Sequence, residues 1–143
     1  MAAQSRASTV WEGDLAHGAG TTTPESGAFP AVEVSWASRT ARAAGKTSPE
    51  ELLAAAHASC YCMALSHELA EAGTPPDRLE ATATVDFEPG EGVRSSHLVV
   101  RGRVPGIDQD RFSEAARAAG EGCPISGALK GNVDIAVDAT LES

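Results

Sequence analysis

Basic residues, aromatic residues and cysteines are scarce in this sequence, and long apolar runs are absent. Eleven Lys and Arg residues stand against twenty Asp and Glu residues, which gives a net charge of −9. A nucleic-acid-binding surface needs clustered basic side chains, so this balance disfavours a nucleic-acid partner. His67, Glu68 and Glu71 interrupt the most apolar stretch, which is shorter than the roughly 18 apolar residues of a membrane-spanning helix. We therefore expect neither nucleic-acid binding nor membrane insertion.

The cysteine count and the first residues indicate the compartment. Only three cysteines are present, Cys60, Cys62 and Cys123. This is an odd and sparse set for a secreted disulfide scaffold, but it is compatible with a reducing cytoplasm. Residues 1–9 lack the apolar core of a secretory signal. We therefore expect a cytoplasmic protein.

Length and composition favour one globular domain. The chain has 143 residues, of which 42% are hydrophobic and 22% are charged, and a chain of this size can fold around a single core. Because aromatic residues make up only 4%, that core must consist mostly of Ala, Val, Leu and Ile. We expect a single domain over residues 1–143.

Hydrophobic periodicity predicts an α+β fold. Residues 17–20 and 26–27 have turn chemistry, and residues 40–46 have little pattern and predict a mobile loop. The turn at 89–92 predicts an antiparallel pair of strands around it. The expected strands are 9–14, 31–38, 79–88, 96–105 and 132–141, and the expected helices are 49–72, 108–120 and 123–131.

The clearest local signal is a helix start at residues 48–51. Ser48 has the chemistry of an N-cap, Pro49 suits the first helical position, and Glu51 completes a capping box. Gly73 predicts the end of this helix. Between residues 52 and 65 the helix is apolar on nearly every side, which predicts a buried helix.

Cys60 and Cys123 occupy different predicted environments. Cys60 lies within the buried helix, where a cysteine is most often a small hydrophobic residue. Cys123 precedes Pro124, so its sulfur would lie beside unpaired backbone N–H groups that favour a thiolate, although a core cysteine is an equally open alternative. Cys62 lies about 200° around the helix from Cys60, so the two can neither form a disulfide nor share a metal. We expect Cys62 to be structural.

Two histidines lie near the same helix stripe as Cys60, namely His57 and His67. A Cys–His nucleophile pair or a metal site is conceivable there, but packed or solvated histidines are the commoner outcome. No zinc-ligand spacing such as CxxC or HxxxH occurs. The glycine-rich segments 18–20 and 90–92 match no phosphate-binding loop. We expect no metal and no cofactor.

Three charged residues also have an ordinary explanation from the sequence alone. Glu50 is an acidic residue in the first turn of a helix, where it offsets the helix dipole. Arg39 ends the strand expected at 31–38, and Arg42 lies in the following loop, so both arginines fit exposed loop charges.

Five segments of the chain closely resemble the OsmC branch of the OsmC/Ohr family of thiol-dependent hydroperoxide reductases. The resemblance extends from about Trp11 to the last expected strand, and the paired motifs around Cys60 and Cys123 are specific. The segments are WEGD at 11–14, GAGT at 18–21, ESG at 25–27, SPEELLAAAHASC at 48–60 and GCPIS at 122–126.

The resemblance implies a fold and four site residues. The fold is an OsmC-like α+β domain with curved antiparallel sheets around long buried central helices, in an intertwined homodimer with two active sites at the subunit interface. Cys60 would be the peroxidatic cysteine, Cys123 the resolving cysteine, and Glu50 the partner of a catalytic arginine. In this branch that arginine falls at the end of the strand, on Arg39. Because the loop is slightly longer than is usual for the family, Arg42 remains a competitor.

The implied reaction reduces an organic hydroperoxide to an alcohol through a Cys60 sulfenic acid and a Cys60–Cys123 disulfide. An external dithiol, lipoyl-based in the related branch, would reduce that disulfide. Glu50 and Cys60 are ten positions apart, about 15 Å along a helix, so we predict that the arginine, Glu50 and Cys60 do not all come from one chain. The apolar surroundings of Cys60 predict a preference for organic hydroperoxides over hydrogen peroxide.

Two other functions remain open on the same fold. One is a small-ligand-binding or stress protein with inert cysteines. The other is a cytoplasmic dithiol oxidoreductase without peroxide specificity. The approach of Cys60 to Cys123 within disulfide distance distinguishes the inert protein from the redox proteins.

Overall fold

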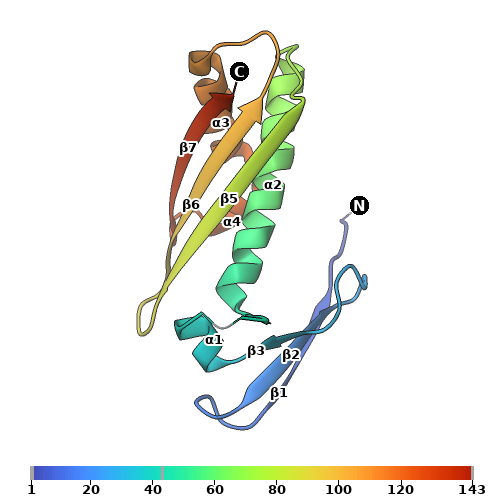
Figure 1. The fold of residues 1–143 in the computed structure, drawn as a ribbon, viewed down its shortest axis with the longest axis vertical. Coiled ribbons are helices and arrows are strands. Elements are labelled where there is room, and N and C mark those ends of the chain that lie inside the picture. The colour runs from blue at the N-terminus through green and yellow to red at the C-terminus, as the bar shows by residue number, and fades with distance from the viewer. Residues whose placement is uncertain (1, 43, 143) are drawn as a thin grey trace. The chain divides into compact units, whose positions relative to one another are not determined.

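A computed structural model describes residues 2–42 and 44–142. The chain forms two compact units, one up to Leu52 and one from Leu53 onwards, and Figure 1 shows the elements of each. The single domain expected over residues 1–143 stays a prediction. Across the described residues, no helix is both long and apolar enough to cross a membrane.

The first unit contains a small sheet with the strand order β1-β2-β3-β4. Neighbouring strands are antiparallel, except that β3 and β4 run parallel. Trp11 pairs with Gly20 across the first two strands, and a Cβ atom at Gly20 would lie 2.7 Å from the Trp11 ring. A glycine is therefore required under this indole. The strands are β1 (Ala7–Glu12), β2 (Ala19–Pro24), β3 (Val32–Val34) and β4 (Lys46–Thr47).

Two expectations for this unit are wrong in detail. The strand expected over 31–38 ends at Val34, because Ser35 and Ser38 form a reciprocal capping box that starts helix α1 (Trp36–Thr40). Arg39 therefore lies in a helical turn rather than at a strand end. Strand β2 was not expected, since its exposed threonines lack apolar alternation. The expected loop at 40–46 includes Ala43, which lies outside the described residues.

Helix α2 (Pro49–Glu71) confirms the predicted long helix. The Ser48 hydroxyl accepts a hydrogen bond from the Glu51 N–H at 3.0 Å, as expected of an N-cap. The Glu51 carboxylate accepts a hydrogen bond from the Thr47 hydroxyl at 2.7 Å. Gly73, with φ of +88°, ends the helix in the left-handed conformation that glycine adopts readily.

The second unit is built on a mixed sheet with the order β5-β6-β7. β5 (Arg78–Glu88) and β6 (Gly92–Arg103) form the expected antiparallel pair, whereas β7 (Asp134–Glu142) runs parallel to β6. A parallel neighbour needs a crossover connection, which α3 (Gln109–Gly122) and α4 (Pro124–Leu129) supply. The expectation of antiparallel sheets therefore needs correction in both units.

The core of the second unit lies between the sheet and helices α2 and α3. Tyr61 of α2 is fully buried, and its hydroxyl donates to the Ala116 carbonyl of α3 at 2.9 Å. A Cβ atom at Gly102 of β6 would lie 2.5 Å from the Phe112 ring, so only glycine fits beneath this phenyl group. The buried hydrophobic residues are Tyr61, Leu65, Leu69, Leu98, Val100, Val104, Phe112, Ala116, Ala119 and Cys123.

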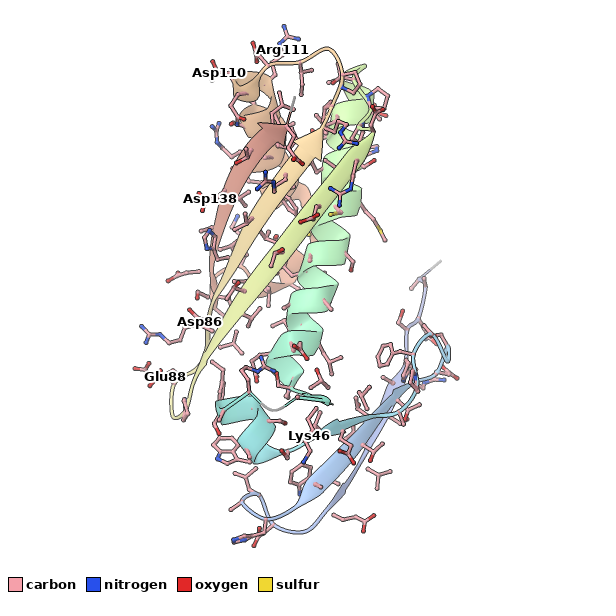
Figure 2. All side chains as sticks on the ribbon, in the orientation of Figure 1. Lys46, Asp86, Glu88, Asp110, Arg111 and Asp138 are labelled. Atoms are coloured by element: carbon pink, nitrogen blue, oxygen red, sulfur yellow. The ribbon has the colours of Figure 1, made fainter. Side chains whose placement is uncertain are left out.

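The opposite face of this sheet is polar. Alternate residues of β5 and β7 are exposed, and Asp86 and Asp138 lie along it in Figure 2. Ser95 donates a hydrogen bond to Asp86 at 3.0 Å, and His97 lies 2.6 Å from Asp138. This alternation of burial explains why the strand pattern was readable from the sequence.

Only one face of α2 is buried within the chain. His57, Tyr61, Leu65 and Leu69 point into the core, whereas Met63 is 73% exposed. The expectation of a helix buried on all sides is therefore wrong for the single chain, because the sheet and α3 cover one side of the helix.

Candidate active site

The two candidate thiols lie together in the second unit. Cys60 is half-buried on α2, and Cys123 is buried at the junction between α3 and α4. Their side chains are neighbours whose ionisations are linked, since Cys60 lowers the pKa of Cys123 and Cys123 raises the pKa of Cys60. Both cysteines are free thiols.

Cys123 is the more acidic thiol of the pair. Burial acts to raise its pKa, but four neighbouring donors lower the pKa below its ordinary value, namely the Ser126 N–H, the Cys60 side chain, the Ser126 hydroxyl and the Ile125 N–H. The sulfur makes no side-chain capping hydrogen bond, yet the first N–H groups of α4 are close enough to stabilise negative charge on it. This agrees with the environment expected from the Cys123-Pro124 sequence.

The surroundings of Cys60 have the opposite effect. Burial raises the pKa of the Cys60 thiol, a hydrogen bond from the Ile125 N–H partly offsets this, and the neighbouring Cys123 raises the pKa further. Within the second unit, therefore, Cys60 is the proton donor and Cys123 the favoured thiolate. A nucleophilic Cys60 needs an additional positive charge.

The first unit contains a pre-organised arginine. Arg39 of α1 donates to the Glu50 carboxylate from Nε to Oε1 at 3.0 Å and from Nη2 to Oε2 at 2.9 Å. Glu50 is 6% exposed, and the Arg39 guanidinium lies 5.9 Å from the centre of the Trp36 ring. A bidentate pair of this kind fixes the plane of the guanidinium. The family resemblance implied that Glu50 partners an arginine, and the structure pairs it with Arg39.

The competing arginine is held loosely by comparison. Arg42 lies 3.7 Å from Glu51, and both side chains are more than half exposed. Such an exposed pair orients its arginine weakly. Of the two candidates, Arg39 is the one that the first unit holds in a defined orientation.

His57 does not form the Cys–His pair that the helix spacing left open. Its ring is fully buried, with Nδ1 2.6 Å from the Ser96 hydroxyl and Nε2 2.8 Å from the Ser126 hydroxyl. Burial lowers the pKa of His57, so the ring is neutral near pH 7. His67, the other histidine considered, is exposed.

Cys62 lies away from the thiol pair. Burial raises the pKa of the Cys62 thiol, partly offset by a hydrogen bond from the backbone of Ala81 in β5. Within residues 2–42 and 44–142, no three His, Cys, Asp or Glu side chains are grouped so that they could hold a metal ion.

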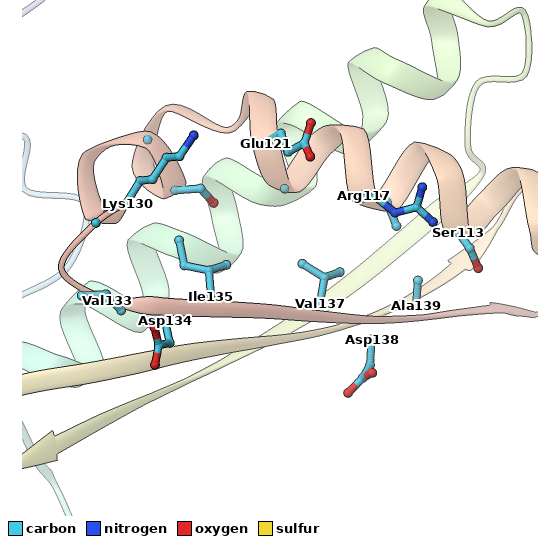
Figure 3. Close-up of a pocket in the computed structure, with 15 residues that line it drawn as sticks. Ser113, Arg117, Glu121, Lys130, Val133, Asp134, Ile135, Val137, Asp138 and Ala139 are labelled. Carbon is cyan, nitrogen blue, oxygen red and sulfur yellow. The ribbon is translucent and has the colours of Figure 1, made fainter.

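A cavity of about 710 Å³ is lined by residues of α3, α4 and β7. Figure 3 shows Ile135, Val137 and Ala139 of β7 facing the two helices, with Arg117 and Lys130 at the margin. Ser126 borders this cavity, but neither Cys60 nor Cys123 lines it. The cavity is therefore separate from the two sulfurs.

Comparison with known proteins identifies the family of this chain. Residues 42–138 match the model of the OsmC-like protein family. The chain is 39% identical over 136 residues to Peroxiredoxin OsmC of Escherichia coli (strain K12), a match that covers 93% of each chain. This chain belongs to the OsmC-like family.

Solved structures of OsmC-like proteins have the same fold. The crystal structure of the organic hydroperoxide resistance protein OhrB of Bacillus subtilis is 28% identical and superposes with a TM-score of 0.69, covering 94% of this chain and 98% of that one. An OsmC-like protein from Mycoplasma pneumoniae has a TM-score of 0.75 at 18% identity, with full coverage of both chains. The expected OsmC-like α+β fold is confirmed.

The OsmC-like family match includes three of the four predicted site residues. Glu50, Cys60 and Cys123 fall within residues 42–138, whereas Arg39 precedes them. Sequence reasoning did not find the two serines that hold His57. The sequence could have pointed to Ser96, because this polar residue occupies an inward position of a strand whose next inward residues are apolar. Ser126, on one turn of helix, offered no such signal.

Proposed function

We propose that this OsmC-like protein is a cysteine-based peroxidase that reduces organic hydroperoxides to alcohols. The observation that carries the proposal is the pair of neighbouring free thiols, Cys60 and Cys123, each of which shifts the pKa of the other. It is supported by the 39% identity to a protein named Peroxiredoxin OsmC and by the likeness to one named for organic hydroperoxide resistance.

In the first step the Cys60 thiolate attacks the distal oxygen of the hydroperoxide. A sulfur–oxygen bond forms while the oxygen–oxygen bond breaks, and the leaving alkoxide takes a proton to become the alcohol. Sulfur is thereby oxidised to a sulfenic acid, and the peroxide is reduced by two electrons.

Arg39 supplies the positive charge that this step needs. The surroundings of Cys60 raise its pKa, chiefly through burial, and a permanently charged guanidinium opposes that effect. The same group can donate to the peroxide oxygens as negative charge develops on them. Glu50 holds the guanidinium in a fixed plane. We propose that the complete site forms in a homodimer, in which Arg39, Glu50 and Cys60 do not all come from one chain.

In the second step the Cys123 thiolate attacks the sulfur of the Cys60 sulfenic acid. The disulfide forms, and hydroxide leaves and takes a proton to become water. An external dithiol, of which a lipoyl group is one example, then returns both cysteines to thiols by exchange through a mixed disulfide. The three cysteines, none of them in a structural disulfide, favour a reducing compartment such as the cytoplasm.

Consumption of cumene hydroperoxide in the presence of a dithiol tests this function. The wild-type protein and Cys62→Ser should turn over, because Cys62 lies outside the pair, whereas Cys60→Ser should not. Wild-type protein that leaves the peroxide untouched would favour a small-ligand-binding or stress protein with inert cysteines.

A thiol–disulfide oxidoreductase is the second candidate. The observation that favours it is that Cys123, at the start of helix α4, is the more acidic thiol of the pair. A thiolate at the N-terminus of a helix attacks disulfides readily. The two candidates differ in their need for arginine. Peroxide turnover that survives Arg39→Ala would indicate a general thiol rather than a peroxide site.

A further inference from the structure

A buried polar cluster lies beside the thiol pair in an otherwise apolar core. His57 of α2, Ser96 of β6 and Ser126 of α4 are each no more than 3% exposed. The His57 ring bonds to Ser96 at 2.6 Å and to Ser126 at 2.8 Å. Polar groups are costly to bury without partners, and here three separate elements converge so that each nitrogen has one.

The cluster reaches the thiol pair through Ser126. The hydroxyl of Ser126, which bonds to His57, lies in the first turn of α4, the helix that Cys123 caps, and it lowers the pKa of the Cys123 thiol. Hydrogen bonds therefore run from Ser96 through His57 to Ser126, whose hydroxyl lies next to Cys123. His57 reaches the sulfur through Ser126.

A neutral His57 ring, together with a Ser126 hydroxyl that donates toward the sulfur, sets the direction of each bond. Burial lowers the pKa of His57, so the ring carries one N–H. When Ser126 donates its proton to a Cys123 thiolate, its oxygen is left to accept from the ring Nε2–H. The ring Nδ1 then accepts from the Ser96 hydroxyl. In this arrangement every bond polarises the next one toward the sulfur.

We propose that His57 is a positioning residue, which holds the Ser126 hydroxyl as a donor toward Cys123 and so keeps a thiolate ready to attack oxidised Cys60. The role of Cys123 as the attacking thiol rests on the proposed function. The role of Ser96 is to fix which ring nitrogen carries the proton.

Few titratable groups face Cys123. From α2 these are Cys60 and Tyr61, and burial, followed by the nearby thiols Cys62 and Cys123, raises the pKa of Tyr61. From α3 the Ala119 carbonyl accepts the Cys123 N–H, and α4 contributes its first N–H groups and Ser126. The charged residues on the cavity that Ser126 borders are Arg117, Glu121, Lys130, Asp134 and Asp138.

Thiolate titration of Cys123 tests this role without any peroxide. In a Cys60→Ser, Cys62→Ser background, Cys123 is the only thiol, and its ionisation can be followed by ultraviolet absorbance against pH. The single tyrosine does not interfere, because its pKa is raised. Ser126→Ala should move the midpoint upward by about one pH unit, a tenfold change in the acid dissociation constant.

Two pairs of variants separate positioning from packing. Ser96→Ala removes the other hydroxyl from the same ring, so it costs similar stability but should move the midpoint less than Ser126→Ala does. His57→Gln keeps an amide donor near the Nε2 position, so its titration midpoint should stay near that of the background protein. His57→Asn places its amide nearer Nδ1 and should shift the midpoint as Ser126→Ala does.

Equal midpoints in the background, Ser126→Ala and Ser96→Ala proteins would overturn the role of His57 and leave a purely structural cluster. If the histidine variants fail to fold, the serine pair alone decides. The outcome is independent of the peroxidase proposal. If the midpoint shifts but the wild-type protein leaves peroxide untouched, the positioning role of His57 stands and the peroxidase function is refuted.

Discussion

Arg39 and Glu50 form a two-pronged ion pair, with Nε 3.0 Å from Oε1 and Nη2 2.9 Å from Oε2. The pair joins the short helix α1 to the first turn of α2. Glu50 is almost fully buried while Arg39 is about one-third exposed. The carboxylate is therefore the fixed partner, and it sets the plane of the guanidinium.

Replacing Arg39 by lysine should lower kcat/KM for cumene hydroperoxide by about 100-fold, because lysine keeps the charge but loses the planar fork. The matched control is Arg42→Lys, whose exposed pair with Glu51 orients nothing in the proposed site. Steady-state kinetics at saturating dithiol measure both. A larger loss in Arg42→Lys would transfer the catalytic role to Arg42.

Organic hydroperoxides should be better substrates than hydrogen peroxide. Cys60 packs against the apolar core, so an alkyl substituent near its sulfur gains roughly 0.8 kcal/mol for each buried methylene group. We expect kcat/KM to rise from hydrogen peroxide to tert-butyl hydroperoxide to cumene hydroperoxide. Equal values for the three peroxides would contradict an apolar substrate site.

Gly102→Ala should lower the free energy of unfolding by about 1 to 3 kcal/mol. A Cβ atom there would lie 2.5 Å from the Phe112 ring, which is fully buried and has little room to move. Gly122→Ala is the control, because its Cβ would meet nothing within 4 Å, and stability should change by no more than about 1 kcal/mol. Urea denaturation compares the two. Equal stability would show that Phe112 can shift at little cost.

The stability of the protein should fall in mild acid through His57. Burial lowers the pKa of the folded residue, so below about pH 6.5 the unfolded chain binds a proton that the folded chain does not. Stability from this group is therefore complete above pH 6.5 and is lost as the pH falls, by up to about 1.4 kcal/mol per pH unit. The slope should be smaller in His57→Gln. Identical slopes would mean that His57 is protonated in the folded state.

Much of the second unit was predictable because its periodicity is local. The antiparallel strands around residues 89–92 and the position of Cys123 at the start of α4 follow from alternation and capping chemistry. Capping chemistry also predicted the helix start at Ser48, which lies in the first unit. The first unit was less predictable. The capping box of Ser35 and Ser38 starts a helix within a segment whose alternating pattern had predicted a strand. Strand β2 is mostly exposed, so its sequence has no apolar alternation.

The site was predictable only where its residues lie in local sequence motifs. Glu50 and the two cysteines lie in local motifs, whereas the pairing of His57 with Ser96 and Ser126 spans 39 and 69 residues. Helix spacing placed His57 near Cys60 but could not reveal that both nitrogens bond to hydroxyls from other elements. Long-range contacts of this kind depend on the packing of β6 and α4 against α2.

Thiol counting before and after one equivalent of cumene hydroperoxide tests the central claim most directly. Wild-type protein should lose two thiols as the Cys60–Cys123 disulfide forms, Cys123→Ser should lose one, and Cys60→Ser should lose none. Cys62 is present in all three proteins and serves as the internal reference. Loss of no thiol in the wild type, or equal loss in Cys60→Ser and wild type, would contradict a peroxidatic Cys60 resolved by Cys123.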